Sequence, residues 1–309
     1  MKTESNLNVE PDEAKLIRRG IRVMIFSVCC FTGNTLILRL LGTERFEMSA
    51  ALPLFFRAAV GILIALLFFR GHRPTRIKPV FTQKKLILRG ITGFIGTAAY
   101  YYTVPTLGAA KATLFCNTYV IFAAVLAAIW LREKLSLVRA IWLILAVIGV
   151  GLLASENSEG IEFGFGLNEL IAIGGAIAAA WTIILIRQLV IEHGNGTIFM
   201  AQCIWILLPV AFLSVHELPG LGALEWGLLI GAASCAAFGQ LMMNEGYRCL
   251  SVTVGASIQM LWPVMTAIGG LLFFDERFLP LQVVGAVLIL SATWRVSVRK
   301  RQKILPTSN

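Results

Sequence analysis

Apolar residues run through this chain in long blocks that short polar segments separate. Most blocks are roughly 20 residues long, the length that a helix needs to cross about 30 Å of hydrocarbon. The pattern therefore predicts ten transmembrane helices. In chain order these expected spans lie near residues 20–41, 49–70, 87–104, 107–130, 137–154, 166–187, 197–215, 225–246, 251–274 and 279–298.

The composition favours the same interpretation. Hydrophobic residues make up 57% of the chain and charged residues only 14%, whereas an average soluble domain has about 25% charged residues. We therefore expect an all-α integral membrane protein with ten transmembrane helices. The polar first 19 residues precede a block of full spanning length without a cleavage site, so we expect no removable signal peptide.

The distribution of charge predicts an orientation. The net charge is +10, but the basic residues fall in short runs between blocks, such as "RGHRPTRIKPVFTQKK" and "RVSVRKRQK", rather than in one patch typical of nucleic-acid binding. The segments expected on the opposite side, "SENSEGIEF" and "VHELPGLGALE", are acidic. The positive-inside rule then predicts cytoplasmic tails at 1–19 and 299–309, in the inner (cytoplasmic) membrane.

Two parts of the chain repeat each other. Residues 107–134 align without a gap with residues 250–277, and the two segments end in "LREK" and "FDER". The offset is 143 residues, or five expected spans. An odd number of spans turns the second copy over, so we expect two inverted five-helix repeats, 20–155 and 156–298. Such repeats are typical of secondary transporters.

Several motifs resemble the drug/metabolite transporter superfamily, specifically its EamA-like branch. They are "FFRAAVGILIALLFF", "AIAAAWTIILIRQL", "LREKLSLVRAIWLILAVIGVGLL" and "QMLWPVMTAIGGLLFFDER". The resemblance covers roughly residues 20–298 and implies a permease with two five-helix halves, whose substrate it does not specify. Val120 stands where family members usually carry a proline, so the resemblance does not imply a helix break there.

Polar side chains inside apolar spans are candidates for a substrate site, because they are costly in lipid. Gln240 and Asn244 share one helix face, since they are four residues apart. They bind either a neighbouring helix or a polar ligand. We expect a central cavity with uncharged polar and aromatic walls, and the resemblance implies that the first and sixth spans also border it. The candidate substrate-binding residues are Asn34, Tyr101, Lys111, Asn117, Tyr119, Trp181, Gln240, Asn244, Gln259 and Trp262.

The charged residues near the spans have two interpretations each. Lys111 either anchors the outer interface or stands at the outer mouth of the cavity, where it would pair with an anionic group of the substrate. Arg57 either caps backbone carbonyls between helices or contributes to the site. We expect Arg57, Glu133 and Glu276 to have structural roles, because "LREK" and "FDER" lie where a helix leaves the membrane.

The motifs that are missing narrow the function. No G-x-x-x-x-G-K-[ST] loop is present, so transport driven by ATP on this chain is excluded. The histidines and cysteines show no catalytic or metal-ligand spacing, so we expect no cofactor, no metal and no disulfide framework. No acidic residue lies at the middle of a span, which disfavours coupling through a buried carboxylate.

We therefore expect a secondary transporter that moves a small polar or amphipathic metabolite by alternating access. Its partners would be the lipid bilayer and a small-molecule substrate, without nucleic acid, in a monomer or homodimer. The alternatives are a membrane-embedded lipid-modifying enzyme, and a small-drug efflux pump or scaffold. An enzyme should carry a polar catalytic cluster near one interface, and no such cluster is evident in the sequence.

Overall fold

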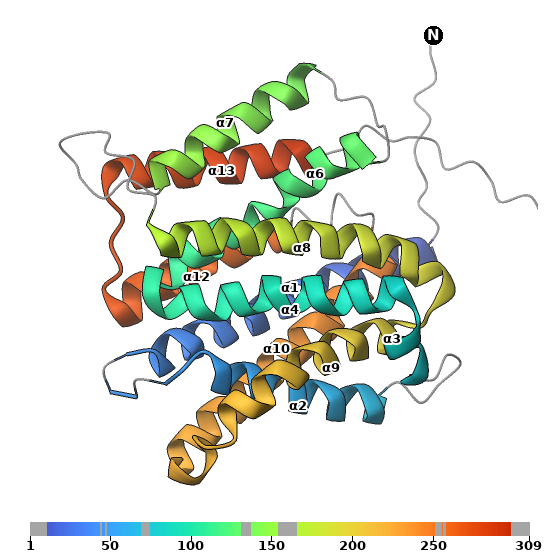
Figure 1. Ribbon diagram of the computed structural model, residues 1–309. Coiled ribbons are helices and arrows are strands. Elements are labelled where there is room, and N and C mark those ends of the chain that lie inside the picture. The colour runs from blue at the N-terminus through green and yellow to red at the C-terminus, as the bar shows by residue number, and fades with distance from the viewer. Residues whose placement is uncertain are drawn as a thin grey trace, which may run out of the picture.

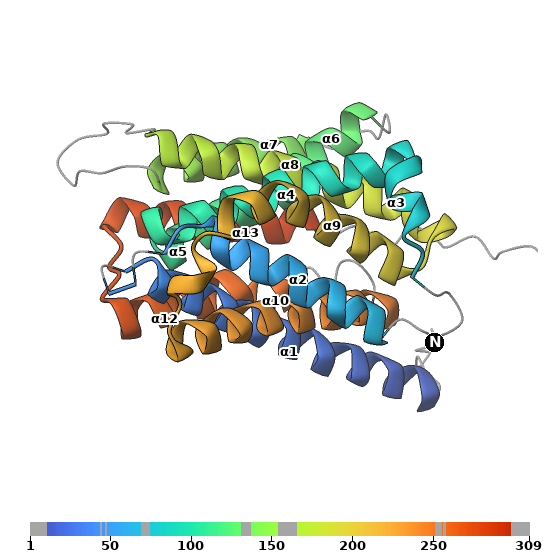
Figure 2. The same ribbon diagram turned by 60° about the horizontal axis from the view of Figure 1, so that its bottom comes forward.

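The helices lie roughly side by side in one bundle, with most of their axes near a common direction (Figures 1 and 2). The structure is a computed structural model, and it describes residues 11–43, 45–46, 48–68, 75–130, 137–153, 166–250, 255 and 258–297. Over these residues every regular element is helical. The helices are α1 (Pro11–Leu41), α2 (Ala51–Phe68), α3 (Lys78–Thr82), α4 (Lys84–Leu107), α5 (Ala109–Asn117), α6 (Tyr119–Trp130), α7 (Leu137–Leu153), α8 (Leu167–Glu192), α9 (Asn195–Ser214), α10 (Ala223–Cys249), α12 (Leu261–Phe274) and α13 (Pro280–Ser297), with a 3₁₀ turn at Leu218–Gly220.

The bundle has the dimensions and surface of a membrane protein. Four described segments are long and apolar enough to cross a bilayer: Lys15–Leu41, Leu167–Ile186, Asn195–Ser214 and Ala223–Met243. Large apolar side chains also stand on the outside, including Phe212, which is 83% exposed, and Phe273, which is 72% exposed. Exposure of such a large apolar surface to water is unfavourable, whereas its exposure to lipid is not, so the surface is typical of a membrane protein. The described helices follow the expected spans, while part of the ninth span, 251–254 and 256–257, lies outside the described residues.

The expected fourth span is divided in two at Thr118. The Thr118 amide donates to the Phe115 carbonyl at 3.1 Å, and the Thr118 hydroxyl donates to the same oxygen at 2.6 Å. A threonine hydroxyl that bonds back to its own helix competes with the regular ladder and bends the helix. The interruption therefore forms without a proline, since residue 120 is a valine. In the second copy of the repeat, residues 250–277, a turn at Met260 comes directly before α12, which has Pro263 in its first turn.

Helix packing follows a regular scheme. α1 packs on α10, and α4 packs on α8; α2 packs on α10, and α4 packs on α9. α2 also contacts α9, α7 contacts α13, and α5 contacts α12. The α7–α13 contact is close enough to need glycine, because a Cβ on Gly285 would lie 2.6 Å from the Gly149 carbonyl oxygen. α4 touches α1, α2, α5, α8 and α9, so it forms the middle of the bundle.

Candidate functional site

A chain of polar contacts joins α1, α2 and α4 in the interior. The Tyr101 hydroxyl donates to Asn34 Oδ1 at 3.1 Å and accepts from Arg57 Nη1 at 3.2 Å. Asn34 and Tyr101 are each 2% exposed, while Arg57 is half-buried. The Arg57 guanidinium also lies 5.5 Å from the centroid of the Tyr101 ring, in range of a cation–π contact. Asn34 and Tyr101, two predicted site residues, are thus in direct contact, and Arg57 adjoins them through Tyr101.

A second set of contacts adjoins the first through Tyr100, whose ring centroid lies 6.3 Å from that of Tyr101. The Tyr100 hydroxyl bonds the hydroxyls of Thr35 on α1 at 2.5 Å and Thr113 on α5 at 3.1 Å. Its ring packs edge-on against Trp262 of α12 at 5.5 Å. The contacts of Tyr100 therefore hold four helices at one level of the bundle.

A small cavity of about 10 Å³, which has room for one water molecule, lies beside Tyr100. It is lined by residues of α4, α5 and α8: Gly96, Tyr100, Thr103, Ala112, Cys116, Ala172, Gly175 and Ala176. A ligand pocket usually measures about 300 to 1,000 Å³, so a metabolite needs the helices around this cavity to move apart. Most of its walls are small residues, which allow such movement at little cost in packing.

Two buried donors near this level have no hydrogen-bond partner in the described protein. They are Asn117 Nδ2 on α5 and Trp262 Nε1 on α12, two helices that pack together. An unsatisfied buried donor costs about 1–3 kcal/mol. Together with the Arg57 guanidinium, these donors place several N–H groups in the interior of the bundle. Such a site is suited to a solute that carries oxygen acceptors.

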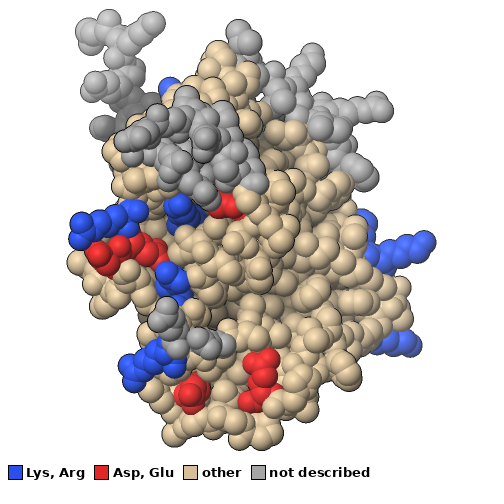
Figure 3. Space-filling model, turned by 60° about the vertical axis from the view of Figure 1, so that its left-hand side comes forward, with Lys and Arg blue, Asp and Glu red and all other residues tan. Residues whose placement is uncertain are grey.

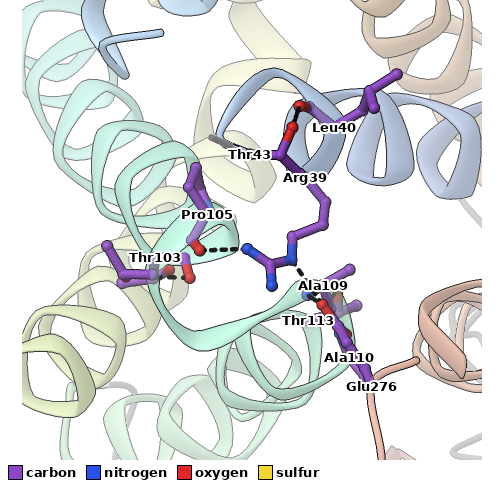
Figure 4. A network of polar contacts seen from close by, with 10 residues as sticks. Arg39, Leu40, Thr43, Thr103, Pro105, Ala109, Ala110, Thr113 and Glu276 are labelled. Carbon is purple, nitrogen blue, oxygen red and sulfur yellow. Dashed lines mark hydrogen bonds and ion pairs between the residues drawn. The ribbon is translucent and has the colours of Figure 1, made fainter. Parts of the chain in front are cut away.

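One end of the bundle is closed by Glu276, which follows the C-terminus of α12 (Figure 4). Its carboxylate accepts from the Ala109 and Ala110 amides at 2.9 and 3.1 Å, and so caps the N-terminus of α5. The same carboxylate pairs with Arg39 Nε at 2.8 Å, while Arg39 Nη1 donates to the Pro105 carbonyl at 2.6 Å. We call these five residues the Glu276 cap. It ties the last turn of α1 and the end of α4 to the end of α12.

The backbone around Glu276 leaves space for the carboxylate. Gly108 has a φ of +89°, and a Cβ there would lie 2.8 Å from Glu276 Oε1. A Cβ on Gly270 would lie 2.6 Å from Glu276 Oε2. The two glycines therefore form the walls of a slot that a carboxylate fills. Figure 3 faces the ends of the helices on the left of Figure 1, where acidic and basic side chains lie close together on one side.

The other predicted site residues are spread more widely. Gln259 is 7% exposed and donates to Ser27 Oγ at 3.2 Å and Met24 Sδ at 3.1 Å. It therefore connects the segment before α12 to α1. Lys111 is half-buried on the first turns of α5, two residues beyond Ala109. Tyr119, Trp181 and Gln240 are half-buried on α6, α8 and α10. The Asn244 side chain and all of Glu133 lie outside the described residues.

Several residues of the interior were missed by sequence reasoning. Thr35 and Thr113 carry no charge and lie in otherwise apolar helices, so nothing in the sequence distinguishes them from other threonines. Arg89 lies at the start of the expected span 87–104, where it resembles one more residue of the basic segment before it. The structure buries Arg89 to 3% exposure between α4 and α9. Its burial depends on packing that the sequence alone does not reveal.

Comparison with known proteins decides the family. The profile of the EamA-like transporter family matches two segments, residues 18–155 and 167–298. The chain belongs to the EamA-like transporter family. It is 25% identical over 293 residues to the pseudopaline exporter CntI of Pseudomonas aeruginosa, a match that covers 93% of this chain and 98% of the exporter.

A second relative is the threonine/homoserine exporter RhtA of Escherichia coli, which is 28% identical over 265 residues, or 80% of this chain and 82% of RhtA. A solved structure described only as the crystal structure of a protein superposes with a TM-score of 0.52 at 15% identity, and covers 92% of this chain and 96% of that one. The family and these relatives are transporters, not enzymes, so the drug/metabolite transporter prediction is confirmed and the lipid-modifying enzyme is rejected.

Proposed function

We propose that this protein exports a small metabolite bearing a carboxylate across the cytoplasmic membrane, by alternating access between two inverted five-helix halves. The observation that carries the proposal is the donor-rich interior of a transporter fold: Arg57, Asn117 Nδ2 and Trp262 Nε1 offer N–H groups. None of them contacts a carboxylate among the described residues. A carboxylate oxygen of the solute would satisfy these donors, whereas a cationic drug would be repelled by Arg57.

The relatives support the same class of solute. RhtA exports threonine and homoserine, which are amino acids and carry a carboxylate. The pseudopaline exporter supports export as the direction. Both relatives match this chain over most of its length, so the proposal extends to the whole chain and not to one half.

The packing scheme supports inverted halves. Exchanging the two halves turns the α1–α10 contact into the α8–α4 contact, and the α2–α10 contact into the α9–α4 contact. The contacts between α2 and α9 and between α7 and α13 map onto themselves. The two family matches, 18–155 and 167–298, divide the chain in the same place. We infer ten spans with both termini cytoplasmic, the orientation that the basic segments favour.

The Glu276 cap supplies an outer gate under this orientation. It joins α1 and α5 of the first half to the end of α12 of the second, so rocking of the halves at that end must break it. We propose that Lys111, next to the cap on α5, guides the anionic solute at the outer mouth. Arg57, Asn117 and Trp262 then form the site below it.

Flux into liposomes tests the proposal. Purified protein is reconstituted, the vesicles are preloaded with unlabelled threonine or homoserine, and uptake of the radiolabelled amino acid is measured by exchange. We expect faster uptake than in protein-free liposomes, and loss of most of the uptake in Arg57→Gln. Equal rates with and without protein, across threonine, homoserine and a panel of other amino acids, would favour the scaffold alternative.

A further inference from the structure

Arg89 is a buried cation on α4, distinct from the half-buried Arg57, and most of its donors have no partner among the described residues. Its Nη2 donates to Gln202 Oε1 at 2.9 Å, and Gln202 Nε2 donates to Thr97 Oγ1 at 2.9 Å. Nε and Nη1 of Arg89 are buried and bond no other described residue. A guanidinium carries five N–H donors, so three of them, on Nε and Nη1, are left over.

The guanidinium is held in place by shape. A Cβ on Gly93, one turn along α4, would lie 2.3 Å from Arg89 Nη1 and 3.2 Å from Gln202 Cγ. The arginine head therefore rests directly on the α4 backbone, with Gln202 of α9 on its other side. Such a fixed, planar group is preorganised to bind an oxyanion, because little conformational entropy remains to be lost.

Packing alone does not explain the charge. The contact between α10 and α2 is the equivalent of the contact between α4 and α9 when the two halves are exchanged. At this equivalent contact, α10 has no charged residue between Glu225 and Glu245. A dry, unpaired cation costs several kcal/mol, and a leucine would fill the same volume more cheaply. Arg57 lies close enough to Arg89 to repel it, and no described carboxylate contacts either residue. The region between α4 and α9 is therefore electropositive and lacks a counter-ion of its own.

We propose that Arg89, with Gln202 and Thr97, forms a second anion subsite, which binds the carboxylate of the solute when α4 and α9 separate at the end where α4 begins. This inference rests on the proposed export of a carboxylate-bearing metabolite. The segment before α4 is basic, so under the inferred orientation the subsite faces the cytoplasm. The solute meets Arg89 first and then passes to Arg57, which contacts the Tyr101 hydroxyl.

Anion binding by purified protein in detergent tests the subsite without any transport. The probe is potassium acetate up to 100 mM, compared with acetamide and with potassium chloride at equal concentration. A site half-saturated at about 10 mM raises the thermal midpoint by roughly 3 °C. We expect this rise for the native chain, less than half of it for Arg89→Gln, and no rise with acetamide. Arg76→Gln removes a charge from an exposed side chain before α4 and should keep the full rise.

Other outcomes separate the alternatives. An equal rise in Arg89→Gln overturns the subsite, and so does a rise with acetamide, which has no charge. Stabilisation by phosphatidylglycerol vesicles but not by acetate would identify a lipid phosphate as the ligand instead. If Arg89→Gln does not fold, Arg89→Lys is measured; loss of the planar fork should raise the half-saturating acetate concentration about tenfold, and an unchanged concentration contradicts the proposal. Normal exchange in liposomes without acetate binding would reject the subsite and leave the exporter intact.

Discussion

Glu276→Gln should open the end of the bundle that the Glu276 cap closes. The native carboxylate accepts three N–H groups, from Arg39, Ala109 and Ala110, at 2.8 to 3.1 Å. Glutamine keeps the shape of the side chain but loses the charge, and its NH₂ group has no acceptor in Arg39. The pair is only partly exposed, 25% for Arg39 and 14% for Glu276, so solvent does not replace the lost contacts fully.

The size of the effect follows from these contacts. A hydrogen bond to a charged group contributes about 1.5–3 kcal/mol, and favourable charge at a helix N-terminus a further 0.3–1 kcal/mol. Glutamine retains one neutral acceptor, so we expect the closed arrangement to lose about 2–3 kcal/mol. Since every 1.4 kcal/mol is tenfold, the open population should rise roughly 30- to 150-fold.

Cysteine labelling measures this population. Cys116 lines the small cavity on α5, seven residues beyond the capped N-terminus, or about 10 Å along the helix. In a variant whose only cysteine is Cys116, a membrane-impermeant maleimide added outside should react at least about 30-fold faster when Glu276→Gln is present, the low side of the predicted shift. The matched control is Asp275→Asn, which removes the neighbouring charge, because the Asp275 side chain is 76% exposed and bonds only Arg277 among the described residues.

A native rate of Cys116 labelling in Glu276→Gln would show that the cap does not hold the gate closed. Equal acceleration by Asp275→Asn would instead indicate a general charge effect at this end of the bundle and would contradict a specific role of Glu276. An exposed pair such as Asp275 and Arg277 contributes at most about 1 kcal/mol, so the control should change the rate by less than fivefold.

Three further predictions concern other parts of the molecule. Gly108→Ala should lower the thermal midpoint and speed Cys116 labelling, because its φ of +89° and a Cβ at 2.8 Å from the Glu276 carboxylate both oppose alanine; unchanged melting would contradict this. Lys111→Gln should leave expression and melting nearly unchanged but slow exchange of an anionic solute, with Lys111→Arg retaining much of it; normal exchange would favour the interface anchor. A reporter fused after Asn309 should be active in the cytoplasm, and activity only outside would reverse the orientation.

The sequence was sufficient for the helical architecture because lipid imposes a simple rule. Every backbone polar group must bond within its own segment, so each apolar block becomes a helix with few alternatives. The fourth span shows where the rule is insufficient. Its interruption at Thr118 depends on a hydroxyl that bonds the Phe115 carbonyl. The sequence does not indicate which threonine of an apolar segment will form such a bond. Proline is a readable signal for a break, whereas threonine is not.

The candidate site was only partly predictable for a related reason. Asn34, Tyr101 and Trp262 could be selected because polar or amphipathic groups in lipid need partners, and the structure places Asn34 and Tyr101 in direct contact. Which partner each residue finds depends on helix rotation, and periodicity fixes rotation poorly when all faces are apolar. Gln259 shows this limit: the structure gives its amide partners on α1, Ser27 and Met24, and its place in a substrate site stays a prediction.

Three arginines, one each on α1, α2 and α4, link the two ends of the proposed cycle. Arg39 at one end has a carboxylate partner from the other half, while Arg57 and Arg89 have none among the described residues. A paired charge favours the arrangement in which its partner is present, whereas an unpaired buried charge is destabilising until an anion arrives. A solute that binds the arginines more tightly in one arrangement shifts the population by that difference in affinity and no more. The Glu276 cap therefore sets the barrier that the binding energy of the solute has to overcome, and a weakened cap should increase leak before it increases flux.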